Sequence, residues 1–382
     1  MSRIIVFPLG LLFATHLNAS PIALNTGFDN TPFISSRAAA LGQCLSTSAN
    51  GLDALYYNPA LIGDFYEKAE KPLITHLFFP YIGSSSGDGG NKVMNDRLTG
   101  EPLSSDKLAK ELKPSSDSIR PYARLSLTPL ALFKRVLVGY TYNERIASYR
   151  NNEDPSKPSL HVDERTMSGP FIGFSEAAAK NEFYMGVSAA FLKTTQTIAE
   201  WDEATATTEA ARKAAVLNGR RSYEGMPIHL GMLYRFSHFL KPTVSLVIND
   251  VGSTRYTPSD KTLSTEVTQE RETLGLSISP SIKNWGTLHL TAEATDLAQA
   301  SVPTRDKFRV SSELTFGDRH GADSGVGIRL GYNAAGLSYG TGINLGILSA
   351  QIASFAEDIG AGSARVIERR SVINVGINIA DY

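Results

Sequence analysis

The sequence predicts an all-β protein, an antiparallel transmembrane β-barrel of about fourteen strands with a small helical plug near its N-terminus. Three observations support this fold class. Apolar and polar residues alternate over many segments between residues 66 and 382. The connections between these segments alternate between long and short. The N-terminal segment that precedes them is rich in small residues and resembles nothing later in the chain.

The alternation is long enough for strands that cross a membrane. For example, Ile228, Leu230 and Met232 share one face of a strand, and His229 and Gly231 share the other. A transmembrane strand needs about 9–11 residues that alternate between lipid and lumen. Such strands must close into a barrel, because lipid cannot satisfy an open sheet edge. A soluble sandwich also alternates, but its strands are usually only about 5–6 residues long.

The expected strands are segments in which this alternation persists between loop-forming residues. The glycine-rich region 334–358 makes the boundary of two of them uncertain, so that twelve strands remain an alternative to fourteen. The expected strands lie near residues 71–81, 119–130, 134–149, 163–177, 181–198, 221–236, 241–251, 268–280, 286–296, 305–317, 325–333, 337–346, 347–356 and 370–382.

The connections follow the pattern of bacterial outer-membrane barrels, which have long extracellular loops and short periplasmic turns. If the N-terminus lies inside, the long connections all fall outside. The expected long connections are 82–118, 150–162, 199–220, 252–267 and 357–369, and the short ones are Leu130–Lys134, Ala178–Asn181, His238–Lys241 and Ser281–Trp285.

Residues 1–19 have the features of a secretory signal peptide. Arg3 gives the positive start, Ile4–Ala14 forms the apolar core, and Leu17–Ser20 offers an exit of mostly small residues, with cleavage expected after Ala19. A buried first helix is the alternative. The 382-residue chain has no apolar run of the roughly 18 residues that a membrane helix needs. We therefore expect the cell outer membrane of a Gram-negative-type bacterium, with membrane lipid as a partner.

Residues 20–65 are expected to form the plug, and residues 66–382 the barrel. The stretch Ser36–Leu61 reads as two short helices broken at Asn50–Gly51. Asn58–Pro59 ends the second helix, because a residue before proline is driven out of the α region. A turn of Asn58, Pro59 and Ala60 follows at the end of this helix.

No pattern in the sequence indicates catalysis, and we expect neither an enzyme nor a cofactor. The seven histidines show no metal-binding spacing, and the single cysteine, Cys44, excludes an internal disulfide. The formal net charge of −1 and pI near 6.7 give no electrostatic case for nucleic acid.

Six charged residues fall on the polar, lumen-facing phase of the expected strands. Because buried charges must be paired, they could form a lattice of salt bridges that braces the barrel or holds the plug. A polar conduction path is the other interpretation. The six residues are Arg124, Arg235, Glu293, Arg309, Glu313 and Arg329.

The N-terminal stretch resembles the plug of the FadL-type outer-membrane transporters, and also that of the related PorV-like barrels. The matching residues are Ser36, Ala38 and Gly42, followed by Asp53–Ala60 with its Asn-Pro-Ala turn. The resemblance implies a signal peptide, an N-terminal plug and a fourteen-stranded barrel. It also implies recognition by the outer-membrane assembly machinery, which reads a last strand ending on an aromatic residue, here Tyr382.

The resemblance leaves two functions open. In the first, the barrel passively takes up hydrophobic small molecules such as long-chain fatty acids, and the plug gates it. In the second, a PorV-like barrel transports nothing and acts as a scaffold for protein secretion or envelope partners. Apolar residues along loops 82–118 and 202–217 would favour the first, whereas a lumen sealed by charge pairs would favour the second.

Overall fold

The computed structural model describes residues 34–49, 51–63, 73–78, 81–85, 122–133, 135–151, 159–178, 182–202, 214, 218–282, 285–317, 324–345, 348–358 and 367–380. The expected signal peptide, most of the residues of loops 82–118 and 202–217, and Tyr382 lie outside these ranges. Within them, no helix is both long and apolar enough to cross a membrane.

The described strands form fourteen antiparallel runs, several of which are interrupted. Pro129 and Pro227 lie at two interruptions, where proline cannot donate to the ladder. The runs are β1 (Leu73–Phe78) with β2 (Tyr81–Ser85); β3 (Tyr122–Leu127) with β4 (Leu130–Phe133); β5 (Val136–Asn151); β6 (Ser159–Ala178); β7 (Phe183–Ala190) with β8 (Leu192–Asp202); β9 (Arg220–Gly225) with β10 (Ile228–Arg235); β11 (Thr243–Asn249) with β12 (Thr254–Pro258); β13 (Glu266–Thr268) with β14 (Arg271–Ile278) and the short β15 (Ser281–Ile282); β16 (Gly286–Thr295); β17 (Phe308–Phe316); β18 (Ser324–Asn333); β19 (Gly336–Leu345); β20 (Leu348–Asp358); and β21 (Ile367–Ala380).

The sheet closes on itself. Each run pairs with the next, and β1 pairs with β21 through Ile74↔Ala380 and Thr75↔Ile379. The predicted antiparallel barrel is thus confirmed. The described runs number fourteen rather than twelve, because β19 and β20 are separate strands joined at residues 346–347.

Side chains alternate between the two faces of this closed sheet as the sequence predicts. On β18, Ile328 and Leu330 are half exposed on the outer face, whereas Arg329 is buried on the inner face. Polar residues such as Ser188 and Ser245 are also buried on the inner face. The apolar outer face suits lipid, and the mainly polar inner face suits a lumen.

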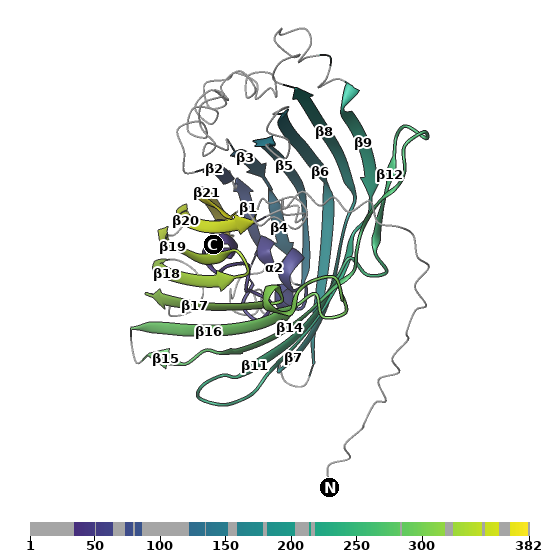
Figure 1. Ribbon diagram of the computed structural model, residues 1–382. Coiled ribbons are helices and arrows are strands. Elements are labelled where there is room, and N and C mark those ends of the chain that lie inside the picture. The colour runs from purple at the N-terminus through teal and green to yellow at the C-terminus, as the bar shows by residue number, and fades with distance from the viewer. Residues whose placement is uncertain are drawn as a thin grey trace.

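One side of the barrel is taller than the other. Figure 1 shows β5, β6, β8 and β9 rising above the level at which β16–β20 end. Strands extend into all five expected long connections. β2 continues to Ser85, β5 to Asn151, β8 to Asp202 and β20 to Asp358, and β12 lies within 252–267. β12 is polar on its outer face, at Arg255 and Thr257, so it lacks the lipid-facing alternation from which strands were recognised.

Aromatic side chains project at the end of the barrel with the short turns. Trp285 is 73% exposed next to β16, and Phe239 is 76% exposed between β10 and β11. Aromatic residues at such positions lie at the boundary between lipid and water.

In a Trp201→Phe background, we expect lipids brominated near the headgroup to quench Trp285 fluorescence strongly. Quenching no greater than that of a soluble tryptophan would contradict this membrane boundary.

The N-terminal segment lies inside the barrel. Helix α1 (Ser36–Ala40) begins at Ser35, whose hydroxyl accepts a hydrogen bond from the Ala38 N–H at 2.9 Å. It ends where Gly42 and Gln43 adopt positive φ. Helix α2 (Leu52–Tyr57) follows Gly51, and Figure 1 shows it enclosed by the strands. We call residues 34–49 and 51–63 the first and second halves of the plug.

The plug crosses the lumen obliquely. Gly42 lies against Tyr332, near the end of β18 that leads into the turn at residues 334–335. This is the end of the barrel that carries the expected long loops. Gly63 lies against Ser175 and Tyr184, near the opposite end of β6 and β7. The two halves of the plug therefore meet chemically different parts of the wall.

Candidate functional site: the plugged lumen

The Asn58–Pro59–Ala60 turn lies in the second half of the plug and is hydrogen-bonded to the first half. The side-chain Oδ1 of Asn58 accepts a hydrogen bond from the Ala60 N–H at 3.0 Å and so closes the turn on itself. The Nδ2 of the same side chain donates to the Ser46 carbonyl at 2.6 Å. Because Asn58 is fully buried, this one amide serves both as a local cap and as a tie to the first half.

The second half rests on an inner wall of glycine and serine. A Cβ built on Gly186 or Gly231 would overlap atoms of the Asn58–Ala60 turn. The hydroxyls of Ser175 and Ser188 donate to the carbonyls of Ala60 and Leu55, each at 2.7 Å. The sequence analysis placed Gly231 on the face opposite to the apolar residues of its strand, but nothing in the sequence showed that it accommodates the plug backbone.

The first half is tied to the opposite wall by charge. The guanidinium of Arg37 donates to both carboxylate oxygens of Glu313, with Nη2 to Oε2 at 2.5 Å and Nε to Oε1 at 3.0 Å. Glu313 also accepts from Nε of Arg329 at 2.7 Å. All three side chains are less than a tenth exposed. Arg37 was not expected in this role, since its partner lies 276 residues away in the chain.

The other predicted lumen charges divide into two groups. Glu293 and Arg309 contact the plug backbone: Glu293 accepts from the Ser46 N–H at 2.5 Å, and Arg309 donates to the Gln43 carbonyl at 3.1 Å. Arg124 and Arg235 contact wall residues instead. Arg124 donates to Asn143 at 3.0 Å, and Arg235 lies 6.0 Å from the ring centre of Tyr184.

An apolar stripe lines the inner wall on the side of the second half. It consists of Leu130 and Leu132 on β4, Leu137 on β5, Met167 and Phe171 on β6, and Leu192 on β8, all buried. Strand pairing makes it continuous, because Leu132 opposes Leu137 and the Phe171 ring lies against Gly139. Leu137 pairs with Gly173 of β6, which marks the lower end of the stripe on that strand. From Gly173 to Met167 the stripe spans six residues of β6, or about 20 Å.

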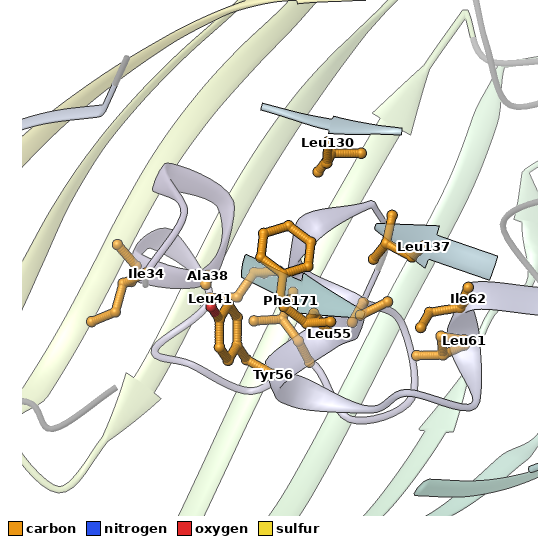
Figure 2. Packing of buried hydrophobic residues seen from close by; sticks show 14 of the residues in the cluster. Ile34, Ala38, Leu41, Leu55, Tyr56, Leu61, Ile62, Leu130, Leu137 and Phe171 are labelled. Carbon is orange, nitrogen blue, oxygen red and sulfur yellow. The ribbon is translucent and has the colours of Figure 1, made fainter. Parts of the chain in front are cut away.

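The plug covers the lower part of this apolar stripe. Figure 2 shows Leu55 and Ile62 of the plug gathered with Leu130, Leu137 and Phe171 of the wall. A small pocket lies there, lined by Gly51 and Ile62 of the plug and three leucines of the wall. The plug thus contacts the wall of the lumen by charge at Glu313 and by apolar contact along the stripe.

The glycine wall gives a direct test of the plug's position. In Gly186→Leu, the new side chain would occupy the space of the Pro59 carbonyl, so we expect the second half to be displaced and ion leak to rise at least several-fold in planar bilayers. Ala189→Leu lies on the outward face of the same strand and is the matched control. Equal leak in both variants would contradict the contact.

Asp53 makes the docking of the plug depend on pH. It is buried beside Ser35, which donates to it at 2.9 Å, and burial raises its pKa to about 6 despite the opposing charges of Arg37 and Arg329, with Glu313 also nearby. A carboxyl with a higher pKa when docked than when free takes up a proton on docking. Docking should therefore strengthen as the pH falls from 7 towards 4.

Bilayer recordings at pH 7.5 and 5 would show this as a lower leak at pH 5. In Asp53→Asn the amide cannot titrate, so we expect the leak to change less between the two pH values. A pH response in Asp53→Asn as large as in the wild-type chain would show that another group is responsible.

No protein-family model matches the chain, and no curated protein does. Solved structures do. The TodX deltaS2S3 mutant monoaromatic hydrocarbon channel is 12% identical, covers 91% of this chain and 98% of its own, and superposes with a TM-score of 0.50. The CymD monoaromatic hydrocarbon channel (11% identical, 92% and 99% covered) and the Ralstonia pickettii toluene transporter TbuX (10% identical, 92% and 100% covered) each give a TM-score of 0.49.

At such low identity, the TodX match speaks to fold alone. It covers nearly the whole of both chains, and it agrees with the closed sheet, the apolar outer face and the enclosed N-terminal segment. The chain therefore has the antiparallel β-barrel fold of this channel, the fold class that the resemblance of its N-terminal segment predicted.

Proposed function

We propose that this chain is a passive outer-membrane channel for hydrophobic small molecules, and that its plug gates the passage. The apolar stripe is the observation on which the proposal rests. The lumen of an outer-membrane barrel is normally polar, and a strip of buried leucine, methionine and phenylalanine side chains about 20 Å long is not needed to hold water or ions. TodX, whose deltaS2S3 mutant has the same fold, is a monoaromatic hydrocarbon channel.

The stripe suggests a route. A hydrophobic molecule entering from the long-loop end would meet Met167 and Leu192 first, then Phe171, and then Leu130 and Leu137 where the plug begins. Each step keeps apolar surface out of water, at roughly 25 cal/mol per Å². Passage beyond Leu137 requires Leu55 and Ile62 to move, and this gives the plug its gating role.

A scaffold of the PorV-like kind is the second candidate. The many ties between plug and wall favour it, since the Arg37–Glu313–Arg329 cluster and the Glu293 contact would suit a barrel that stays shut. A barrel that stays shut would, however, have no use for the apolar stripe on its inner wall. We therefore place uptake first.

Uptake of a labelled long-chain fatty acid and of labelled toluene into expressing cells distinguishes the two candidates. The control is Asn58→Ala/Pro59→Ala, which removes the hydrogen bonds of the Asn58 side chain to Ser46, Ala60 and Met232. We expect saturable uptake of at least one compound and a changed rate in the variant. No uptake of either compound, with the protein present in the outer membrane, would favour the scaffold.

A further inference from the structure

We propose that Tyr256 on β12 is the residue at which hydrophobic molecules enter the apolar stripe, and that its ring binds them before they reach the buried part of the wall. The inference rests on the proposed uptake function. It adds a binding residue to the route, and it names the contact made there, an apolar molecule against the face of an aromatic ring.

Tyr256 continues the apolar stripe beyond Leu192. β12 pairs with β9 through Thr257↔Glu224, so the residue before Thr257 lies opposite Gly225. The Tyr256 ring covers that glycine, because a Cβ at Gly225 would lie 2.5, 2.7 and 2.9 Å from three of its atoms. Gly225 in turn pairs with Leu192, and Tyr256 packs against the apolar cluster that contains the stripe.

Tyr256 is also where this apolar surface meets water. Leu192 and Phe171 are 2% and 3% exposed, whereas Tyr256 is partly exposed. Figure 1 shows β12 beside β9, in the tall part of the barrel. A molecule that arrives from the long-loop end therefore has access to Tyr256 before it has access to the buried stripe.

A chain of polar side chains borders the stripe at this level. The amide of Gln196, with its oxygen facing Arg165, accepts a hydrogen bond from Nη2 of Arg165 at 2.7 Å and donates one to Oε1 of Glu266 at 3.2 Å. Glu266 is the strand partner of Tyr256. On β6 the wall changes from charged to apolar between Arg165 and Met167. A hydrophobic molecule that passes this border first gains apolar contacts at the level of Tyr256.

The ring is not placed for contact with lipid. The outer face of β12 carries the polar residues Arg255 and Thr257, and Tyr256 lies on the opposite face. A tyrosine has an apolar ring face for a hydrophobic molecule and a hydroxyl for polar neighbours. These two properties suit a position between the polar border and the stripe.

Binding at Tyr256 can be measured without transport. The chain has two tryptophans, Trp201 and Trp285, and replacing both by phenylalanine leaves Tyr256→Trp as the single fluorescent indole. In liposomes, we expect bromobenzene or a brominated long-chain fatty acid to quench it with saturation. Thr257→Trp, on the outer face of the same strand, is the matched control and should be quenched only in proportion to the probe concentration. Quenching without saturation at both positions would overturn the proposal.

Uptake gives a second test. Tyr256→Ala should raise the concentration for half-maximal uptake about five-fold, since contact with an aromatic ring contributes up to about a factor of ten in affinity. This rise should exceed any fall in the maximal rate. Tyr256→Phe keeps the ring and should recover most of the affinity. A higher ion leak in Tyr256→Ala, with the half-maximal concentration unchanged, would assign the ring to holding the plug and overturn the proposal.

The binding residue and the proposed function fail separately. Saturable quenching of Tyr256→Trp in a chain that takes up nothing would contradict the proposed function and leave the binding residue standing. Saturable uptake that is the same in the wild-type chain and in Tyr256→Ala would contradict the binding residue and leave the function standing. Heat-dependent gel mobility would check that each variant is a folded barrel.

Discussion

Replacing two leucines of the apolar stripe by asparagine, Leu130→Asn with Leu137→Asn, is expected to lower hydrophobic uptake by about ten-fold or more. Each amide would face an apolar molecule without a hydrogen-bond partner, at a cost of roughly 1–3 kcal/mol, and about 1.4 kcal/mol corresponds to a factor of ten. The measurement is the initial rate of uptake of the labelled compound, normalised to the amount of folded barrel.

The matched control for the stripe is Leu130→Met with Leu137→Met, which keeps the wall apolar at similar volume. We expect it to retain most of the uptake. If the asparagine and methionine variants transported equally well, the stripe would not be the route, and a path along the charged wall would have to be considered.

Removing residues 24–62 should leave a folded barrel but raise its conductance at least ten-fold. The barrel is closed by the pairing of β1 with β21, which does not involve the plug. Glu313 would still be paired with Arg329, so the deletion leaves no unpaired charge at that point of the wall. The measurement is single-channel conductance in planar bilayers, with heat-dependent gel mobility to verify the barrel.

Unchanged permeability after this deletion would mean that residues 24–62 do not block the lumen. The full-length chain carrying Arg37→Met is a useful intermediate, since it should leak more than the wild-type chain and less than the deletion. This order follows because the variant loses one contact between the plug and the wall, whereas the deletion removes the plug.

The barrel was predictable because a membrane strand displays its environment directly in its sequence. Ile328, Arg329 and Leu330 alternate between lipid and lumen, and such alternation located all fourteen runs. The method failed where that contrast ends. Beyond the apolar band, β12 has the polar residues Arg255 and Thr257 outside, and it was taken for a loop.

The candidate site was only partly predictable for a related reason. The Asn58–Pro59–Ala60 turn is local, and the proline after Asn58 indicates it in the sequence. The contact of Gly186 with Pro59, and that of Arg37 with Glu313, join residues far apart in the chain, and no short-range pattern encodes such contacts. Leu137 was hidden differently, because it follows Val136 and precedes Val138, and a run that is apolar on both faces has no period of two.

Uptake of a hydrophobic compound compared with that of a sugar of similar mass tests the central claim most directly. Cells expressing the chain would be given labelled long-chain fatty acid, labelled toluene and a labelled disaccharide, beside cells lacking it. We predict saturable uptake of a hydrophobic compound and none of the disaccharide. Equal uptake of all three would indicate an open aqueous pore, and no uptake of any would indicate a sealed scaffold; either result would contradict a plug-gated hydrophobic channel.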